Sequence, residues 1–496
     1  MQCENSRVRL TLRRAALIVL LLIAAGILVQ VSGVVALAAA ALGVAPERIG
    51  FDARSLLTPR KVATALAFAL VMAVAWGLLR RDAGARLLRG VPHMSAAGAG
   101  AFRIGLAAAL AFALVEAGPI QPGLSPELQR NAGAFANWWW AHALAAHPTA
   151  AQWLHDALLA AIVVFGLGLF TRAATVAVAA LATLNAIVLL QRQSAHDWGL
   201  PVVALWLLTL APLGDVLSLD SVLRRRRGRP APARTSQEYG LAVWIPGLAL
   251  GVAFLAAAFA KLDTSGLAWV IGGAVRYHFI EDARHAPTDW GLRIAANDTA
   301  SMLASLAALL VEAVLVVHVF VRSWSVRAVF GALAAALLGG FFLFQGVVWR
   351  LWWALLVAFL PWEPIAAALT RRVPRTEGND EHEPGTGNEE PGTVGAAQRL
   401  APIRRWQVVV LAGFLLQQVL FSSVHLELEP FASDYGMYAF TWPSREAFEA
   451  HLVRKLRTVR VESTPDGTRV ITEEPVFDWS RGRFAPPRIT VELRNE

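Results

Sequence analysis

Long apolar runs separated by short polar segments dominate the pattern of this chain. Each run is about 20 residues, the length of helix that crosses a hydrocarbon core of about 30 Å. The runs are continuous and do not alternate, so they predict membrane-spanning helices and not the strands of a barrel. We expect about eleven spans. They cover residues 15–42, 62–79, 98–118, 151–170, 173–191, 199–218, 240–260, 300–321, 327–348, 351–369 and 406–424.

Composition supports this pattern. Hydrophobic residues make up 56% of the 496 positions and charged residues only 16%, with a mean hydropathy of +0.50. Eighteen tryptophans against four tyrosines suit a protein with aromatic anchors at the lipid interface. The predicted fold class is an all-α polytopic membrane helical bundle with a small C-terminal α+β extramembrane domain.

The net charge of +9 comes from arginines clustered between the apolar runs. Such clusters lie on the cytoplasmic side under the positive-inside rule, although Arg48, Arg54 and Arg60 in loop 43–61 fit this poorly. We therefore expect a multi-pass protein of the cell (inner) membrane with a cytoplasmic N-terminus and an extracytoplasmic C-terminus. No basic surface is interleaved with aromatics, so nucleic acid is not an expected partner. Cys3 is the only cysteine, which excludes a disulfide framework and a cysteine-built metal site; no metal site is predicted.

Five regions are expected along the chain. They are an N-terminal accessory helical hairpin at 1–92, a transmembrane core at 93–372, a Gly-, Pro- and acid-rich disordered cytoplasmic linker at 373–405, a last transmembrane helix at 406–424 and a small extracytoplasmic domain at 425–496. In the last region, Ser444 is placed to cap a short helix, and the alternation around Pro465-Asp466-Gly467 predicts a hairpin. The stretch NWWWAH at 137–142 predicts an interfacial helix.

Two ionisable residues at the ends of predicted spans are the candidate catalytic groups. Lys261 ends a long uncharged run, and burial there would favour a neutral amine that can act as a base. His196, followed by Asp197 and Trp198, lies on the same predicted side and could be a second base or a proton relay. The alternative is that Lys261 snorkels to the interface as an anchor and His196 is an ordinary loop histidine.

Trp269, Arg276 and Tyr277, which follow Lys261, are the candidate cofactor-binding residues. Arg276 could hold a carboxylate or bicarbonate, or could be an exposed cation at a lipid headgroup. We expect Lys261 and His196 to face one cavity that opens outward, with Trp269 and Tyr277 on its wall. No phosphate-binding loop, H-E-x-x-H or G-x-S-x-G motif is present.

Four stretches in the same order resemble the vitamin K-dependent γ-glutamyl carboxylases and their bacterial relatives, the horizontally transferred transmembrane domain (HTTM) proteins. AKLDTSGLAWVIGGAVRYHF, from Ala260, is similar to the family's K-L-D segment with its tryptophan and glycine. GLGLFTRAATVAVAAL, from Gly166, resembles a helix pair. SAHDWGLPVVALWLLTLAPLGDVLSLDSVLRRRR resembles the histidine loop and span, and PFASDYGMYAFTW the segment after the last helix. The resemblance covers residues 95–370 well and 400–445 more weakly.

This resemblance implies a function. In the carboxylases, a lysine and a histidine at these motif positions are the bases that act on the vitamin K hydroquinone, and these roles would fall on Lys261 and His196. It further implies a quinol cofactor, O₂ and CO₂ as co-substrates, and a protein or peptide substrate outside, in addition to the lipid bilayer. Gln345 stands where many relatives have a histidine. Two hypotheses follow: quinone-coupled proton abstraction or carboxylation, or a non-enzymatic membrane scaffold, lipid or quinone binder or assembly factor.

Overall fold

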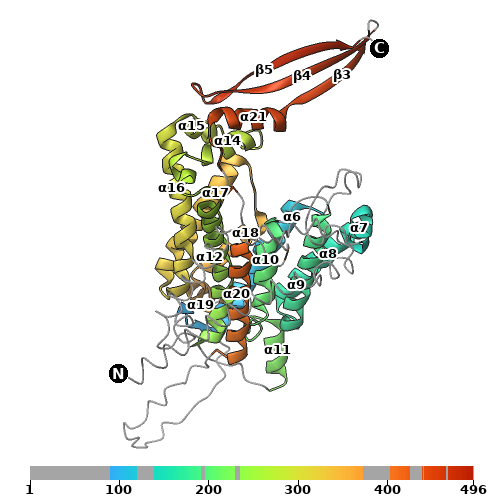
Figure 1. The fold of residues 1–496 in the computed structure, drawn as a ribbon. Coiled ribbons are helices and arrows are strands. Elements are labelled where there is room, and N and C mark those ends of the chain that lie inside the picture. The colour runs from blue at the N-terminus through green and yellow to red at the C-terminus, as the bar shows by residue number, and fades with distance from the viewer. Residues whose placement is uncertain are drawn as a thin grey trace, which may run out of the picture.

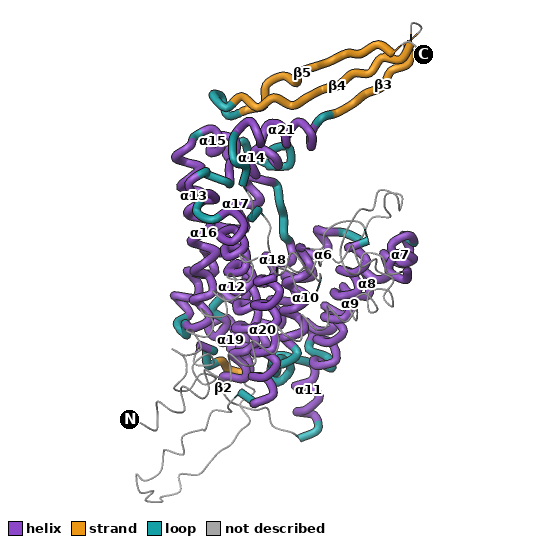
Figure 2. Tube along the Cα trace, viewed as in Figure 1, coloured by secondary structure: helices purple, strands orange, loops and turns teal. Residues whose placement is uncertain are grey.

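The computed structural model describes residues 90–119, 139–191, 196–228, 235–371, 403–424, 430, 438–439, 441–464 and 467–494. The spans expected at 15–42 and 62–79, and most of the linker expected at 373–405, lie outside these residues. The described chain is mostly helical and carries a small sheet near its C-terminus (Figures 1 and 2).

Six described helices are long and apolar enough to cross a membrane. They are α6 (Ala96–Ala117), α8 (Pro148–Leu167), α9 (Thr171–Leu190), α12 (Gln237–Ser265), α16 (Asp298–Val314), which continues as the 3₁₀ helix η4 (Leu315–Phe320), and α17 (Trp324–Gln345). A bent pair would make a seventh span. The membrane bundle is therefore supported within the described residues, whereas the count of about eleven is not confirmed.

Two expected spans differ from a straight membrane-crossing helix. The run 199–218 forms α10 (His196–Leu208), which ends before Pro212, and the short α11 (Leu219–Arg226) follows. The run 351–369 is broken by 79° between α18 (Arg350–Leu355) with η5 (Leu356–Phe359) and α19 (Trp362–Arg371). Leu360 is extended because it precedes a proline. The last run forms the single helix α20 (Arg405–Val424), as expected.

Helix α12 is the most buried of the long helices. Its N-terminus is capped by Ser236, whose hydroxyl accepts from the Tyr239 amide. Two glycines one turn apart allow close packing against η4: a Cβ at Gly247 would lie 2.5 Å from Nε2 of His318, and one at Gly251 2.9 Å from Cα of Val316. Helix α12 therefore acts as the axis around which the other helices pack.

Three short helices after α12 lie at one end of the bundle: α13 (Ala268–Ile271), α14 (Val275–Asp282) and α15 (Trp290–Ala296). Gly273, at φ +61°, makes the turn between α13 and α14, and a Cβ there would lie 2.8 Å from Cβ of Ser301. The short α7 (Trp139–Ala146) overlaps the stretch 137–142 that was expected as an interfacial helix. Strands β1 (Met94–Ser95) and β2 (Thr235–Ser236) pair where α6 and α12 begin.

The predicted C-terminal helix and hairpin are confirmed. Helix α21 (Arg445–Leu456) begins at Ser444, whose hydroxyl accepts from the Ala447 amide at 3.2 Å. It is followed by an antiparallel sheet of order β3–β4–β5, built from β3 (Thr458–Thr464), β4 (Gly467–Asp478) and β5 (Arg483–Arg494). The sheet lies above α21 at the end of the bundle formed by α13–α15, and α11 lies at the opposite end (Figure 1). Below, "the cap" means α13–α15, α21 and this sheet.

Candidate functional site

The strongest candidate site is a buried ion pair between two long helices. The Nζ atom of Lys261 lies 3.0 Å from Oε1 of Glu312. Lys261 is near the cap end of α12, and Glu312 is in the neighbouring α16. The two residues are only 3% and 1% exposed. Two opposite charges this deeply buried stabilise each other, since either one alone would be costly in the bundle.

A small cavity adjoins the pair. Lys261 and Glu312 both line it, and its aromatic walls come from Phe254, Phe341, Trp349, Trp352 and Tyr438. The ammonium of Lys261 also lies 5.4 Å from the ring centre of Trp269, within the range of a cation–π contact. In this conformation the cavity has room for about one water molecule. A proton donor or acceptor that entered it would therefore meet the ion pair directly.

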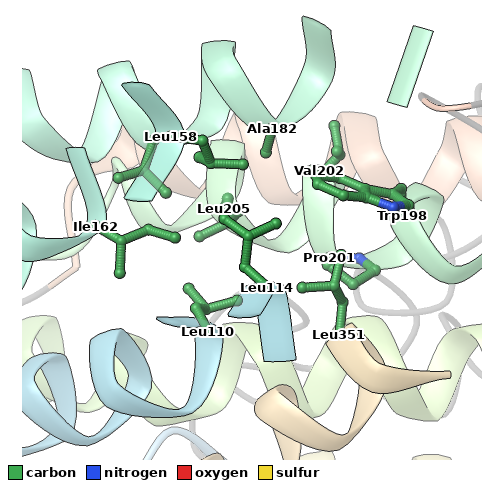
Figure 3. Close-up of a pocket in the computed structure, with 11 residues that line it drawn as sticks. Leu110, Leu114, Leu158, Ile162, Ala182, Trp198, Pro201, Val202, Leu205 and Leu351 are labelled. Atoms are coloured by element: carbon green, nitrogen blue, oxygen red, sulfur yellow. The ribbon is translucent and has the colours of Figure 1, made fainter. Parts of the chain in front are cut away.

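A second cavity of similar size has a different character. Leu110, Leu114, Leu158, Ile162, Leu205 and Leu351 are among its lining residues, which belong to α6, α8, α9, α10 and α18 (Figure 3). No ionisable side chain is among the residues that line it. This gap between helices is apolar, so it offers no chemistry comparable to that of the Lys261–Glu312 pair.

His196 lies behind the wall of the first cavity and does not line it. Its carbonyl oxygen accepts a hydrogen bond of 3.1 Å from the Trp352 indole, which is itself part of that wall. The neighbouring Asp197 accepts 3.1 Å from the Leu351 amide. These bonds fix the start of α10 against α18. The expectation of one cavity shared by Lys261 and His196 thus differs from the described lining, in which Glu312 is the second ionisable group.

Trp269, Arg276 and Tyr277 are buried, and they hold the cap to the bundle. The Trp269 indole donates to the Tyr438 carbonyl at 2.8 Å. Nη1 of Arg276 lies 2.6 Å from Oδ1 of Asp298, which also pairs with Arg445 of α21 at 2.5 Å. These contacts explain the burial of Trp269 and Arg276 without a bound cofactor.

Tyr277 occupies an aromatic cluster beneath the sheet. Its ring centre lies 5.4 Å from Trp442, 4.9 Å from Phe448 and 6.4 Å from Trp479. Trp269 and Tyr277 are absent from the described lining of the cavity beside Lys261. The wall expected from these two residues is formed instead by residues of α12, α17, α18 and the chain before α21.

An acidic pair on α14 connects this region to the cap surface. Although burial opposes it, hydrogen bonds from Lys455 and His451 of α21 hold the pKa of Glu281 below its usual range. Burial, together with the charge of Glu281, raises the pKa of Asp282 to about 6. Burial also raises the pKa of Tyr438, whose side chain is hydrogen-bonded to Asp282. Tyr438 therefore connects the lining of the cavity to the partly exposed Asp282.

Glu312 was missed by the sequence interpretation, although a signal was present. It is the only acid in the predicted span 300–321. An ionisable residue inside a span is a functional candidate, and that rule was applied to Lys261 alone. The position of Tyr438 had no comparable signal, because the aromatic residue reaches the cavity from a segment far along the chain.

Comparisons with protein-family models, with curated proteins and with solved structures found no match for this chain. The carboxylase-like interpretation therefore depends on the quoted motifs alone. Among the described residues, no group of three or more His, Cys, Asp or Glu side chains is arranged to hold a metal ion.

Proposed function

We propose that this protein is a membrane enzyme in which the Lys261–Glu312 pair moves a proton at the cap end of the helical bundle. The observation that carries this proposal is the burial of both groups beside a small aromatic cavity. Transfer of the proton from Lys261 to Glu312 leaves two neutral groups, and a low-dielectric surrounding favours that exchange. The neutral amine of Lys261 is then a base next to the cavity.

The substrate class proposed is a quinol, followed by a carboxylation-type reaction, as the motif resemblance implies. A quinol supplies an acidic hydroxyl group on a flat apolar ring. The walls made by Phe254, Trp349 and Trp352 suit such a ring in chemistry. They do not suit it in volume in this conformation, because the cavity has room for only about one water. Ring entry would require a wall side chain to move.

Tyr438 and Asp282 complete the proposal. A proton taken up by Lys261 must leave for the next turnover, and the hydrogen bond between Tyr438 and Asp282 offers a path to the cap surface. The arginines of α11 lie at the other end of the bundle from the cap. By the positive-inside rule, this arrangement supports an extracytoplasmic cap and site.

The test has two parts. Mass spectrometry of host proteins should reveal carboxylated glutamate when the gene is present and none when it is deleted. Complementation with Lys261→Met or Glu312→Gln should abolish the modification. Arg293→Ala, which removes an exposed ion pair of α15 with Asp289, is the matched control and should retain it. Absence of carboxylated glutamate with the wild-type gene would reject carboxylation as the reaction.

A non-catalytic membrane scaffold is the second candidate, favoured by the small volume of the cavity. It predicts that the purified protein gains no thermal stability from an added quinol. The enzyme proposal predicts a rise of the unfolding midpoint, since a ligand bound only to the folded state stabilises it. That rise should disappear in the double variant Lys261→Met with Glu312→Leu.

A further inference from the structure

The C-terminal sheet has two edges with different protection. At the β5 edge, Pro486 and Pro487 lack backbone N–H groups and stand at an irregularity of the register with β4. Prolines and bulges blunt an edge against pairing with another strand. The β3 edge has no proline, and within the described residues β3 pairs with β4 alone. Strand β3 therefore presents a row of backbone groups open to a further strand.

Strand β3 is also complementary to itself. Its side chains alternate between valines and charges, with Val459 and Val461 on one face and Arg460 and Glu462 on the other. Both valines are more than half exposed, at 53% and 61%. The contacts of Arg460 within its own chain are long, 3.9 Å to Glu462 and 3.8 Å to Glu473.

We propose that β3 pairs antiparallel with β3 of a second copy of this chain, so that two caps share one six-stranded sheet. When the pairing is centred on Val461, Val461 of one copy lies opposite Val461 of the other. Arg460 of each copy then lies opposite Glu462 of the other copy, which gives two cross-strand charge pairs. Centring on Arg460 or on Glu462 would place like charges directly opposite, which is destabilising. Among the three central positions of β3, the side chains thus favour the register centred on Val461.

The sheet stands clear of the membrane-spanning helices. It lies above α21, and α21 lies above the helical bundle (Figure 1). Strand β3 extends away from α21 toward the free end of the sheet. A second copy can therefore reach this edge outside the bundle.

A standard protein interface buries about 1,200–2,000 Å², and pairing of one short strand buries less than this. We therefore expect the contact to be weak in detergent. The test therefore uses the full chain in its native membrane. In a Cys3→Ser background, Val461→Cys is oxidised, and two co-expressed tags identify copy-to-copy products. A disulfide-linked dimer is expected. The matched control Ile489→Cys, at a residue of β5 that is 59% exposed, should give no dimer above background.

Charge reversal makes the test specific. Adding Arg460→Glu should lower the dimer yield about tenfold, because both cross-strand charge pairs become repulsive. Adding Glu462→Arg as well should restore it. Any one of four results would overturn the proposal. They are equal cross-linking through Ile489→Cys, no dimer through Val461→Cys, no rescue by the double reversal, and a product formed only with a different protein.

Discussion

Two buried cations, Arg103 and Lys261, show how the same bundle uses charge in different ways. Arg103 of α6 is fully buried, and its guanidinium donates to backbone carbonyls only: Leu213 at 2.7 Å, Gly166 at 3.3 Å and Leu217. Gly166 is in the last turn of α8, and Leu213 and Leu217 lie between α10 and α11. Arg103 therefore satisfies carbonyl groups that have no partner within a helix. Carbonyl oxygens of peptides do not take up a proton, and a guanidinium does not release one. The site is structural.

Lys261 has a carboxylate as its partner and a cavity beside it. Both members of this pair can exist in charged and neutral forms, so a proton can move between them. The difference lies in the partner and not in burial, since both cations are almost completely hidden. A buried cation becomes a candidate for chemistry when its partner is titratable and an open space adjoins the pair.

The largest effect is expected at the structural cation. Arg103→Met removes at least two well-formed hydrogen bonds from a charged donor, each worth roughly 1.5–3 kcal/mol, and leaves buried carbonyls unpaired. That total approaches the whole stability of a typical domain. We expect little or no monodisperse protein by size-exclusion chromatography in mild detergent. Arg225→Met, at an exposed arginine of α11, is the control and should give a normal yield.

The next largest effect on stability is expected when one member of the Lys261–Glu312 pair is removed and the other is left in place. Glu312→Ala leaves Lys261 buried without its carboxylate and should cost about 3–5 kcal/mol. The double variant Lys261→Met with Glu312→Leu removes both charges and should unfold close to the wild-type temperature. Thermal unfolding of the purified variants measures both. If the single variant is as stable as the wild type, water reaches the site and the comparison with Arg103 fails.

The sequence predicted the helical bundle because apolar runs of sufficient length have few other solutions in lipid. It also predicted α21 and the β3–β4 hairpin from Ser444 and the Pro465-Asp466-Gly467 turn, which are local signals. The number of spans was not predictable from length alone. The breaks after Leu208 and at Leu360 depend on Pro212 and Pro361, which end helices inside apolar runs.

The candidate site was predicted in part for a similar reason. Lys261 stood out because charge is rare in its surroundings. Its pairing with Glu312 depends on which spans are neighbours, and hydropathy carries no such information. Arg276 and Tyr277 were grouped with Lys261 because they are near in sequence. In the fold, helices α13 and α14 turn them toward the cap, where Asp298 and Trp442 surround them.

A third effect concerns pH at the cap, where the charges are partly exposed. Hydrogen bonds from Lys455 and His451 lower the pKa of Glu281 in the folded protein below its ordinary value of 4.5, although burial opposes them. A lowered carboxyl pKa contributes stability above the unfolded value and loses it as pH falls through the folded value. The attachment of α21 should therefore weaken as pH falls below about 4.5. Hydrogen exchange of α21 amides, measured at pH 6 and pH 4 and corrected for intrinsic rates, should show this loosening. Glu281→Gln should remove the loosening, because the neighbouring Asp282, whose pKa is raised to about 6, gains stability as pH falls.

The smallest effect on stability is expected at Tyr438. Tyr438→Phe keeps the ring, which packs against His278 at 4.8 Å and Phe341 at 6.1 Å, and removes only the hydroxyl that is hydrogen-bonded to Asp282. One hydrogen bond to a partly exposed carboxylate contributes about 1.5 kcal/mol, so the unfolding midpoint should fall less than in Glu312→Ala. Turnover should fall more than stability, because the proposed path for the proton from Lys261 passes through this hydroxyl. Measured side by side, the two variants distinguish a group that supports the fold from one that supports proton release. Unchanged turnover in Tyr438→Phe would place the proton path elsewhere and leave the Lys261–Glu312 pair to exchange protons with water in the cavity.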